Sequence, residues 1–283
     1  MRIFLFMFIL VFTLQAKPIF SNTDQADSSQ YIDALKNLVV ATQKTRGLTN
    51  SYLNGNLIAL MLVQDAKSDM KKAIGTMESL KLASDPVINQ RASDVSNKLI
   101  ELNRKGFKLK PEEAFERYTQ EIEQILMLAQ TVSKRSAEHM TPFAKDASFV
   151  MMEQMLPLSE YVGQLRGYGS GIAAKAAITQ EQKENLSIII ADLSTLHKEL
   201  QTRVKNMLNG GKKYYPQDLE AKVAKMNSSL EAYVDFAKKE FSKESIAINP
   251  DDYFTNGTEI ITQIISLYDA TNKAVLEDSK GWL

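Results

Sequence analysis

Apolar and polar residues alternate along this chain with the period of amphipathic helices. Leu, Ala, Lys, Glu, Gln and Met fill long intervals, and proline and glycine gather near the ends of those intervals. Such a distribution is typical of helices that bury one face. Cap and turn residues predict eight helices, near residues 31–53, 57–82, 84–104, 110–140, 141–171, 179–209, 216–241 and from 249 to the C-terminal region. The sequence therefore predicts an all-α fold.

Several helix starts carry specific chemistry. Asp85 followed by Pro86, and Thr141 followed by Pro142, each place a capping side chain before a proline in the first turn. Thr179 and a glutamine three residues later form a capping-box pattern. These signals set the boundaries of the third, fifth and sixth predicted helices.

Two of the predicted helices carry an Arg-Gly pair within an apolar stripe. Arg46 and Arg166 lie 120 residues apart, and each is followed by a glycine. Alternating steps of four and three residues trace the buried face of a packed helix. The two stripes read Leu35, Val39, Thr42, Arg46, Thr49, Leu53 and Met155, Ser159, Val162, Arg166, Gly169, Ala173. Both guanidinium groups should therefore point toward neighbouring helices. The related motif in the first and the fifth predicted helix also suggests that the eight helices form two four-helix units.

A buried arginine needs a negative partner, because an unpaired buried charge costs several kcal/mol or more. One interpretation is a salt bridge within the protein, to a core-facing carboxylate such as Glu121, Glu153 or Glu259. The other is a bound anion. The glycine-rich run at residues 167–171 does not match a phosphate-binding loop, because no strand precedes it and no Gly-Lys-Ser/Thr follows it. The run indicates a helix kink or tight helix packing instead.

The first 16 residues have the pattern of a secretory signal peptide. One arginine precedes a short apolar run, and Ala16 offers a cleavage point. A membrane anchor is the alternative, but the run is shorter than the roughly 20 residues that a span requires. We therefore expect a signal peptide at 1–16, a flexible lead at 17–30, a single helical domain at 31–283, and a periplasmic or secreted protein.

Composition argues against several functions. The 34 basic residues balance 34 acidic ones, so nothing resembles the basic surface that nucleic acid requires. Two histidines and no cysteine leave few ligands for a transition metal, and we expect neither a metal nor a cofactor. No nucleophile lies beside a base in any recognisable motif, so we expect no enzymatic activity.

Three segments resemble the nitrate- and nitrite-sensing (NIT) domain family. Residues 43–53 are similar to its opening helix, although Thr45 replaces the usual acidic residue, and residues 165–175 are similar to its second Arg-Gly segment. Residues 249–261 are similar to the start of its closing helix. The resemblance implies two up-down four-helix bundles and a small oxyanion held between helices by Arg46 and Arg166.

A guanidinium suits nitrate or nitrite because its planar fork of donors matches a small planar anion. We expect Gly47 and Gly167 to allow close backbone approach, and Thr42, Thr49 and Ser170 to add hydroxyl groups. Family members usually precede a membrane, kinase, chemotaxis or RNA-binding module. A freestanding exported version would signal through a membrane sensor or chemoreceptor partner, and such bundles commonly form homodimers through an exposed helix face. The alternative function is a helical scaffold or interaction protein whose arginines are purely structural.

Overall fold

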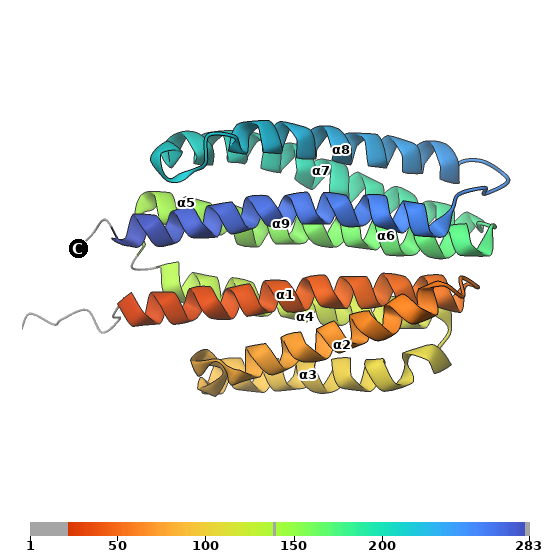
Figure 1. Ribbon diagram of the computed structural model, residues 1–283, viewed down its shortest axis with the longest axis horizontal. Helices are drawn as coiled ribbons and strands as arrows, with labels where there is room; N and C mark the ends of the chain where they lie inside the picture. The colour runs from red at the N-terminus through yellow and green to blue at the C-terminus, as the bar shows by residue number, and fades with distance from the viewer. Residues whose placement is uncertain (1–21, 138–139, 281–283) are drawn as a thin grey trace, which may run out of the picture.

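The computed structural model describes residues 22–137 and 140–280, and these residues fold into long, nearly aligned helices (Figure 1). The predicted signal peptide at 1–16 lies outside the described residues. The elements are α1 (Asn22–Leu53), α2 (Ala59–Ser79), η1 (Lys81–Ser84), α3 (Pro86–Lys105), η2 (Gly106–Lys108), α4 (Pro111–Ser136), α5 (Pro142–Val150), η4 (Met151–Met155), α6 (Leu156–Lys175), α7 (Gln180–Gly210), η5 (Lys212–Tyr214), α8 (Leu219–Phe241) and α9 (Pro250–Lys280). The all-α prediction is confirmed.

The helix starts follow the predicted capping chemistry. Asp85 accepts hydrogen bonds from two backbone amides of α3, and Thr141 accepts one from α5. Thr179 and Gln182 form both bonds of a capping box at the start of α7. Because each cap accepts hydrogen bonds from backbone amides that the helix itself leaves unpaired, these residues determine where the three helices begin.

The fifth predicted helix is one continuous helix with a π-helical turn inside it. Residues 151–155 (η4) form a π-helical turn that joins α5 to α6 without a break. The glycine-rich run does not kink α6, which continues to Lys175. Residues 22–30 form the first turns of α1, although we expected them within the flexible lead. In these turns Asp27 accepts a hydrogen bond from Lys81, and Ser29 donates one to Asn272.

The rods form two four-helix units that lie side by side. The first contains α1, α2, α3 and α4, and the second contains α5–η4–α6, α7, α8 and α9 (Figure 1). Within the units, α1 packs mainly on α2 and α4, and α6 packs mainly on α9 and α7. The extensive contact of α1 with α6 joins the units, and one cluster of buried apolar side chains includes residues from both. The two Arg-Gly helices are therefore the central pair of the molecule.

Candidate functional site

Two glycines let α1 and α6 touch at the centre of the fold. A Cβ atom added to Gly167 would lie 3.0 Å from the Cα of Gly47, tighter than nine in ten real Cβ contacts. Beyond this contact, the Asn50 amide donates a 2.9 Å hydrogen bond to the carbonyl of Gly167. Each glycine directly follows one of the two arginines, so the close approach brings both guanidinium groups to the same level of the bundle.

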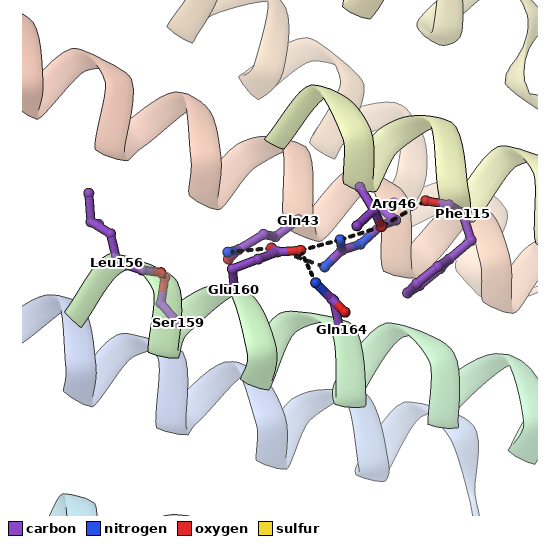
Figure 2. Close-up of polar contacts among 8 residues, drawn as sticks. Gln43, Arg46, Phe115, Leu156, Ser159, Glu160 and Gln164 are labelled. Atoms are coloured by element: carbon purple, nitrogen blue, oxygen red, sulfur yellow. Dashed lines mark hydrogen bonds and ion pairs between the residues drawn. The ribbon is translucent and has the colours of Figure 1, made fainter. Parts of the chain in front are cut away.

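Arg46 is fully buried and forms an ion pair across the boundary between the units. Its Nη1 lies 2.5 Å from Oε1 of Glu160 on α6, and its Nη2 lies 3.2 Å from Oε2 (Figure 2). Nη1 also donates to the hydroxyl of Thr119 at 2.8 Å, and the guanidinium stacks over the ring of Phe115 at 4.7 Å. A forked pair of this kind positions the guanidinium more firmly than one point contact would.

Glu160 is buried and well supplied with donors. Besides Arg46, the amides of Gln43 and Gln164 donate to its two carboxylate oxygens at 3.0 Å and 2.9 Å (Figure 2). Four donor contacts thus surround a carboxylate that is 4% exposed. Hydrogen bonds of this kind offset part of the desolvation cost of a buried ion pair.

Arg166 lies in a matching setting on the other side of the α1–α6 contact, but without a carboxylate. Its Nη1 donates to the hydroxyl of Thr258 on α9 at 2.8 Å, and the guanidinium lies over the ring of Phe254 at 4.4 Å. Its side chain is buried, and its Nε and Nη2 have no hydrogen-bond partner among the described residues. No carboxylate in residues 22–137 or 140–280 forms a salt bridge with it.

Burial without a counter-charge changes the proton affinity of this group. Desolvation lowers the pKa of Arg166 to about 10, and the nearby positive charge of Arg46 acts in the same direction. The group remains a cation at neutral pH. Buried polar groups normally have partners, so two unpaired guanidinium nitrogens mark a place where a ligand oxygen would be stabilised.

A family profile described as nitrate and nitrite sensing (NIT) matches residues 37–276, most of the chain. The chain belongs to the NIT family. Among solved structures, one described as the structure of the NasR transcription antiterminator has the same fold, with a TM-score of 0.68 over 92% of this chain and 70% of that chain. Sequence identity to it is 14%. Comparison with curated protein sequences finds no significant match.

The NIT domain brings four of the seven predicted site residues together. Arg46, Arg166, Gly47 and Gly167 all lie at the contact between α1 and α6. These residues come together because both Arg-Gly pairs lie on the buried faces of their helices and face each other at the same position along α1 and α6.

The three predicted hydroxyl groups point elsewhere. Thr42 donates to a carbonyl one turn earlier in its own helix, at 2.7 Å. Thr49 packs beside Tyr118 of α4, and Ser170 donates to the carbonyl of Pro250 at 3.3 Å. Two other hydroxyl groups, those of Thr119 and Thr258, contact the guanidinium groups instead.

The intramolecular carboxylate that pairs with Arg46 is not one of the three that the sequence suggested. Glu121 pairs with Lys98 at 3.4 Å, Glu153 pairs with Lys134 at 3.3 Å, and Glu259 is exposed. Glu160 was missed because it directly follows the stripe position Ser159 and so lies at the edge of the buried face. The long arginine side chain reaches back toward the N-terminal end of its helix, which brings this edge position within range.

A second internal repeat in the sequence marks the threonine and phenylalanine partners. Residues 111–119 and 250–258 both read proline, two acidic residues, phenylalanine four positions after the proline, and threonine eight positions after it. The proline and acidic residues start α4 and α9, which places each Phe and Thr on the face toward an arginine. This repeat was the signal in the sequence that could have identified Thr119 and Thr258.

The described residues offer few other candidate sites. They contain no group of three or more histidine, aspartate or glutamate side chains arranged to hold a metal ion. Within them, no helix is both long enough and apolar enough to cross a membrane.

Proposed function

We propose that this NIT domain binds one nitrate or nitrite ion at the contact between α1 and α6, where Arg46 and Arg166 lie. The observation that supports the proposal most strongly is that Nε and Nη2 of the buried Arg166 guanidinium have no hydrogen-bond partner among the described residues. A bound oxyanion would accept hydrogen bonds from these nitrogens and would neutralise their charge. Family membership supports nitrate or nitrite as the ion.

The local charge favours a monoanion. Two arginines and Glu160 give the buried cluster one net positive charge. A monoanion makes the filled cluster neutral, whereas sulfate would leave a net negative charge in a site of low dielectric. Nitrate and nitrite are also planar and weakly hydrated, so removing them from water costs less than removing a dianion.

Anion binding at this place can change how the two four-helix units pack. Arg166 belongs to α6, its partner Thr258 belongs to α9, and α1 packs against both. A ligand shifts a conformational equilibrium only when it binds one state better. An ion that contacts helices of both units would favour the arrangement that brings those helices together, and this gives the domain a way to signal.

The domain would act outside the cytoplasm and report to a separate membrane sensor or chemoreceptor. The sequence of residues 1–16, with its single arginine and short apolar run, supports export with cleavage after Ala16. Mass spectrometry of protein recovered from the extracellular or periplasmic fraction tests this part. An intact N-terminus in the cytosol would contradict it. A homodimer and the lack of a nucleic-acid partner remain predictions from the sequence, as does the lack of enzymatic activity.

One observation favours the alternative of a helical scaffold. Arg46 and Glu160 form the intramolecular ion pair that a purely structural role requires. Under this alternative Arg166 would also be structural, and no small anion would alter stability.

Thermal unfolding of the purified protein with nitrate, nitrite, chloride or sulfate at equal ionic strength separates the two functions. An ion at about a hundred times its dissociation constant stabilises the folded state by roughly 2.7 kcal/mol, which raises the midpoint by several degrees. We expect that rise with nitrate or nitrite and none with chloride or sulfate. Equal midpoints in all four salts would favour the scaffold.

A further inference from the structure

The two arginines, which lie 120 residues apart, have equivalent neighbours, which lie 139 residues apart. Arg46 contacts Phe115 and Thr119 of α4 at 4.7 Å and 2.8 Å. Arg166 contacts Phe254 and Thr258 of α9 at 4.4 Å and 2.8 Å. We call these two groups the Arg46 half-site and the Arg166 half-site. From these matching contacts we infer that the two units are related by an approximate two-fold axis between α1 and α6.

The half-sites differ at the position that supplies the anion. Glu160, the partner of Arg46, lies six residues before Arg166 on α6. The position six residues before Arg46 on α1 is Val40, which is half-buried. By the same numbering, Lys44 is the counterpart of Gln164, and its amine lies 3.9 Å from Asp69 of α2. The Arg46 half-site therefore has a carboxylate and an amide, and the residues at the corresponding positions of α1 are a valine and a lysine.

We propose that Glu160 is the built-in anion of the Arg46 half-site, and that the external monoanion binds only in the Arg166 half-site, beside the unpaired Nε and Nη2 of Arg166. This inference rests on the proposed function and specifies it further. The NIT domain then binds one ion per chain, and Glu160 determines that number. The Arg46–Glu160 ion pair links the two units and stays intact when the ion binds.

The contacts of Glu160 argue against its displacement by a ligand. The carboxylate receives hydrogen bonds from Arg46, Gln43 and Gln164, and it is 4% exposed. An anion that took its place would leave this carboxylate buried without its cation. An anion at Arg166 would displace no carboxylate, because Nε and Nη2 of Arg166 have no hydrogen-bond partner within residues 22–137 and 140–280.

The surface next to the Arg46 half-site also disfavours an entering anion. A cleft of about 690 Å³ between α4, α6 and α7 includes Phe115, Thr119 and Gln164 in its walls. Its charged lining is mainly acidic, with Glu112, Glu116, Glu123 and Glu181 against Lys175. An anion would meet repulsion there.

The guanidinium of Arg166 offers an external ion a different edge from the one that Glu160 occupies on Arg46. A carboxylate and a nitrate ion both present two coplanar oxygens to a guanidinium fork. Glu160 places its two oxygens at 2.5 Å and 3.2 Å from the terminal nitrogens of Arg46. The free Nε and Nη2 of Arg166 form the edge that would receive the two oxygens of the ion.

Exchanging the residue at position 40 provides the first test. Val40→Glu would supply Arg166 with an intramolecular carboxylate, so we expect nitrate affinity, measured by calorimetry, to fall at least tenfold. The melting midpoint in nitrate-free buffer should rise. Val40→Gln has the same length without the charge and should weaken binding far less. Equal nitrate affinity in Val40→Glu and Val40→Gln would overturn the inference.

The reciprocal change provides the second test. Glu160→Gln removes the built-in anion and opens the Arg46 half-site, so the number of nitrate ions bound per chain should rise from one to two. A stoichiometry of one in folded Glu160→Gln, or of two in the unaltered protein, would overturn the inference. If Glu160→Gln does not fold in nitrate, the comparison at position 40 decides alone.

These results separate the inference from the proposed function. Absence of nitrate and nitrite binding in the unaltered protein would contradict the function itself. Binding that persists unchanged in Val40→Glu would leave the function intact and contradict only the assignment of the half-sites.

Discussion

The guanidinium of Arg46 and the carboxylate of Glu160 meet in the buried contact between α1 and α6, with Nη1 2.5 Å from Oε1. The pair links the first four-helix unit to the second. On the other side of the same contact, Arg166 has a threonine and a phenylalanine in equivalent places but no paired carboxylate from the part of the chain that the structure describes. The two arginines, which look alike in sequence, should therefore respond differently to mutation.

Replacement of Arg46 should destabilise the fold. Arg46→Met keeps much of the side-chain volume but leaves Glu160 as a buried charge without its cation, which costs about 3 to 5 kcal/mol. Urea unfolding measures the loss. Arg117→Met is the matched control, because Arg117 pairs with Glu113 on the surface and should lose less than about 1 kcal/mol. Similar losses in the two variants would show that the buried pair does not stabilise the contact.

Replacement of Arg166 should affect binding more than stability. Arg166→Met removes a desolvated cation together with one hydrogen bond and one cation–π contact, so the opposing effects should leave stability within about 1 kcal/mol of the unaltered protein. The rise in melting midpoint caused by nitrate should vanish. A destabilisation as large as that of Arg46→Met would indicate that Arg166 has a structural partner.

Close packing of the central glycines should make Gly167 intolerant of a side chain. Gly167→Ala would place a Cβ 3.0 Å from the backbone of Gly47 and 3.1 Å from the ring of Phe115. We expect a loss of about 1 to 3 kcal/mol in urea unfolding, as for other overpacked sites. Gly75→Ala is the control. That glycine lies in α2 with nothing within 4 Å of an added Cβ, so the change should stabilise the protein by up to about 1 kcal/mol.

Nitrate affinity should follow the protonation of Arg166. Burial lowers the pKa of Arg166 from 12.5 to about 10 in the ion-free protein, and only the protonated guanidinium binds an anion. Affinity should therefore be constant between about pH 6 and pH 9 and should decrease above pH 10, where the free protein loses the proton. Calorimetric titrations across this range provide the measurement. A change in affinity near pH 6 to 7 would point to another titrating group.

The predicted fold depended on signals that are local in sequence. Asp85, Thr141 and Thr179 cap helices by contacts within the next few residues, so their boundaries could be predicted. The alternating stripes likewise placed Arg46 and Arg166 inside, since the helical period alone decides which face is buried.

The partners of the arginines could not be predicted in the same way. Glu160 pairs with Arg46 across the contact between α6 and α1. The helical period of α6 does not tell which residues of α1 lie opposite which residues of α6. Thr119 and Thr258 act through a repeat whose two copies lie 139 residues apart, a different offset from the Arg-Gly repeat. The π-helical turn at residues 151–155 shifts the register of the rod ahead of Glu160, and no simple pattern of residues marks it.

The most direct test of the central claim is a titration of the protein with nitrate, followed by the Nε–H resonances of its arginines in ¹H–¹⁵N NMR spectra. The Arg166→Met and Arg46→Met variants assign the two buried resonances. The proposal predicts a saturable shift of the Arg166 resonance, with a much smaller shift for Arg46, and no saturable change with sulfate. A shift confined to Arg46, or no saturable shift at either arginine, would contradict it.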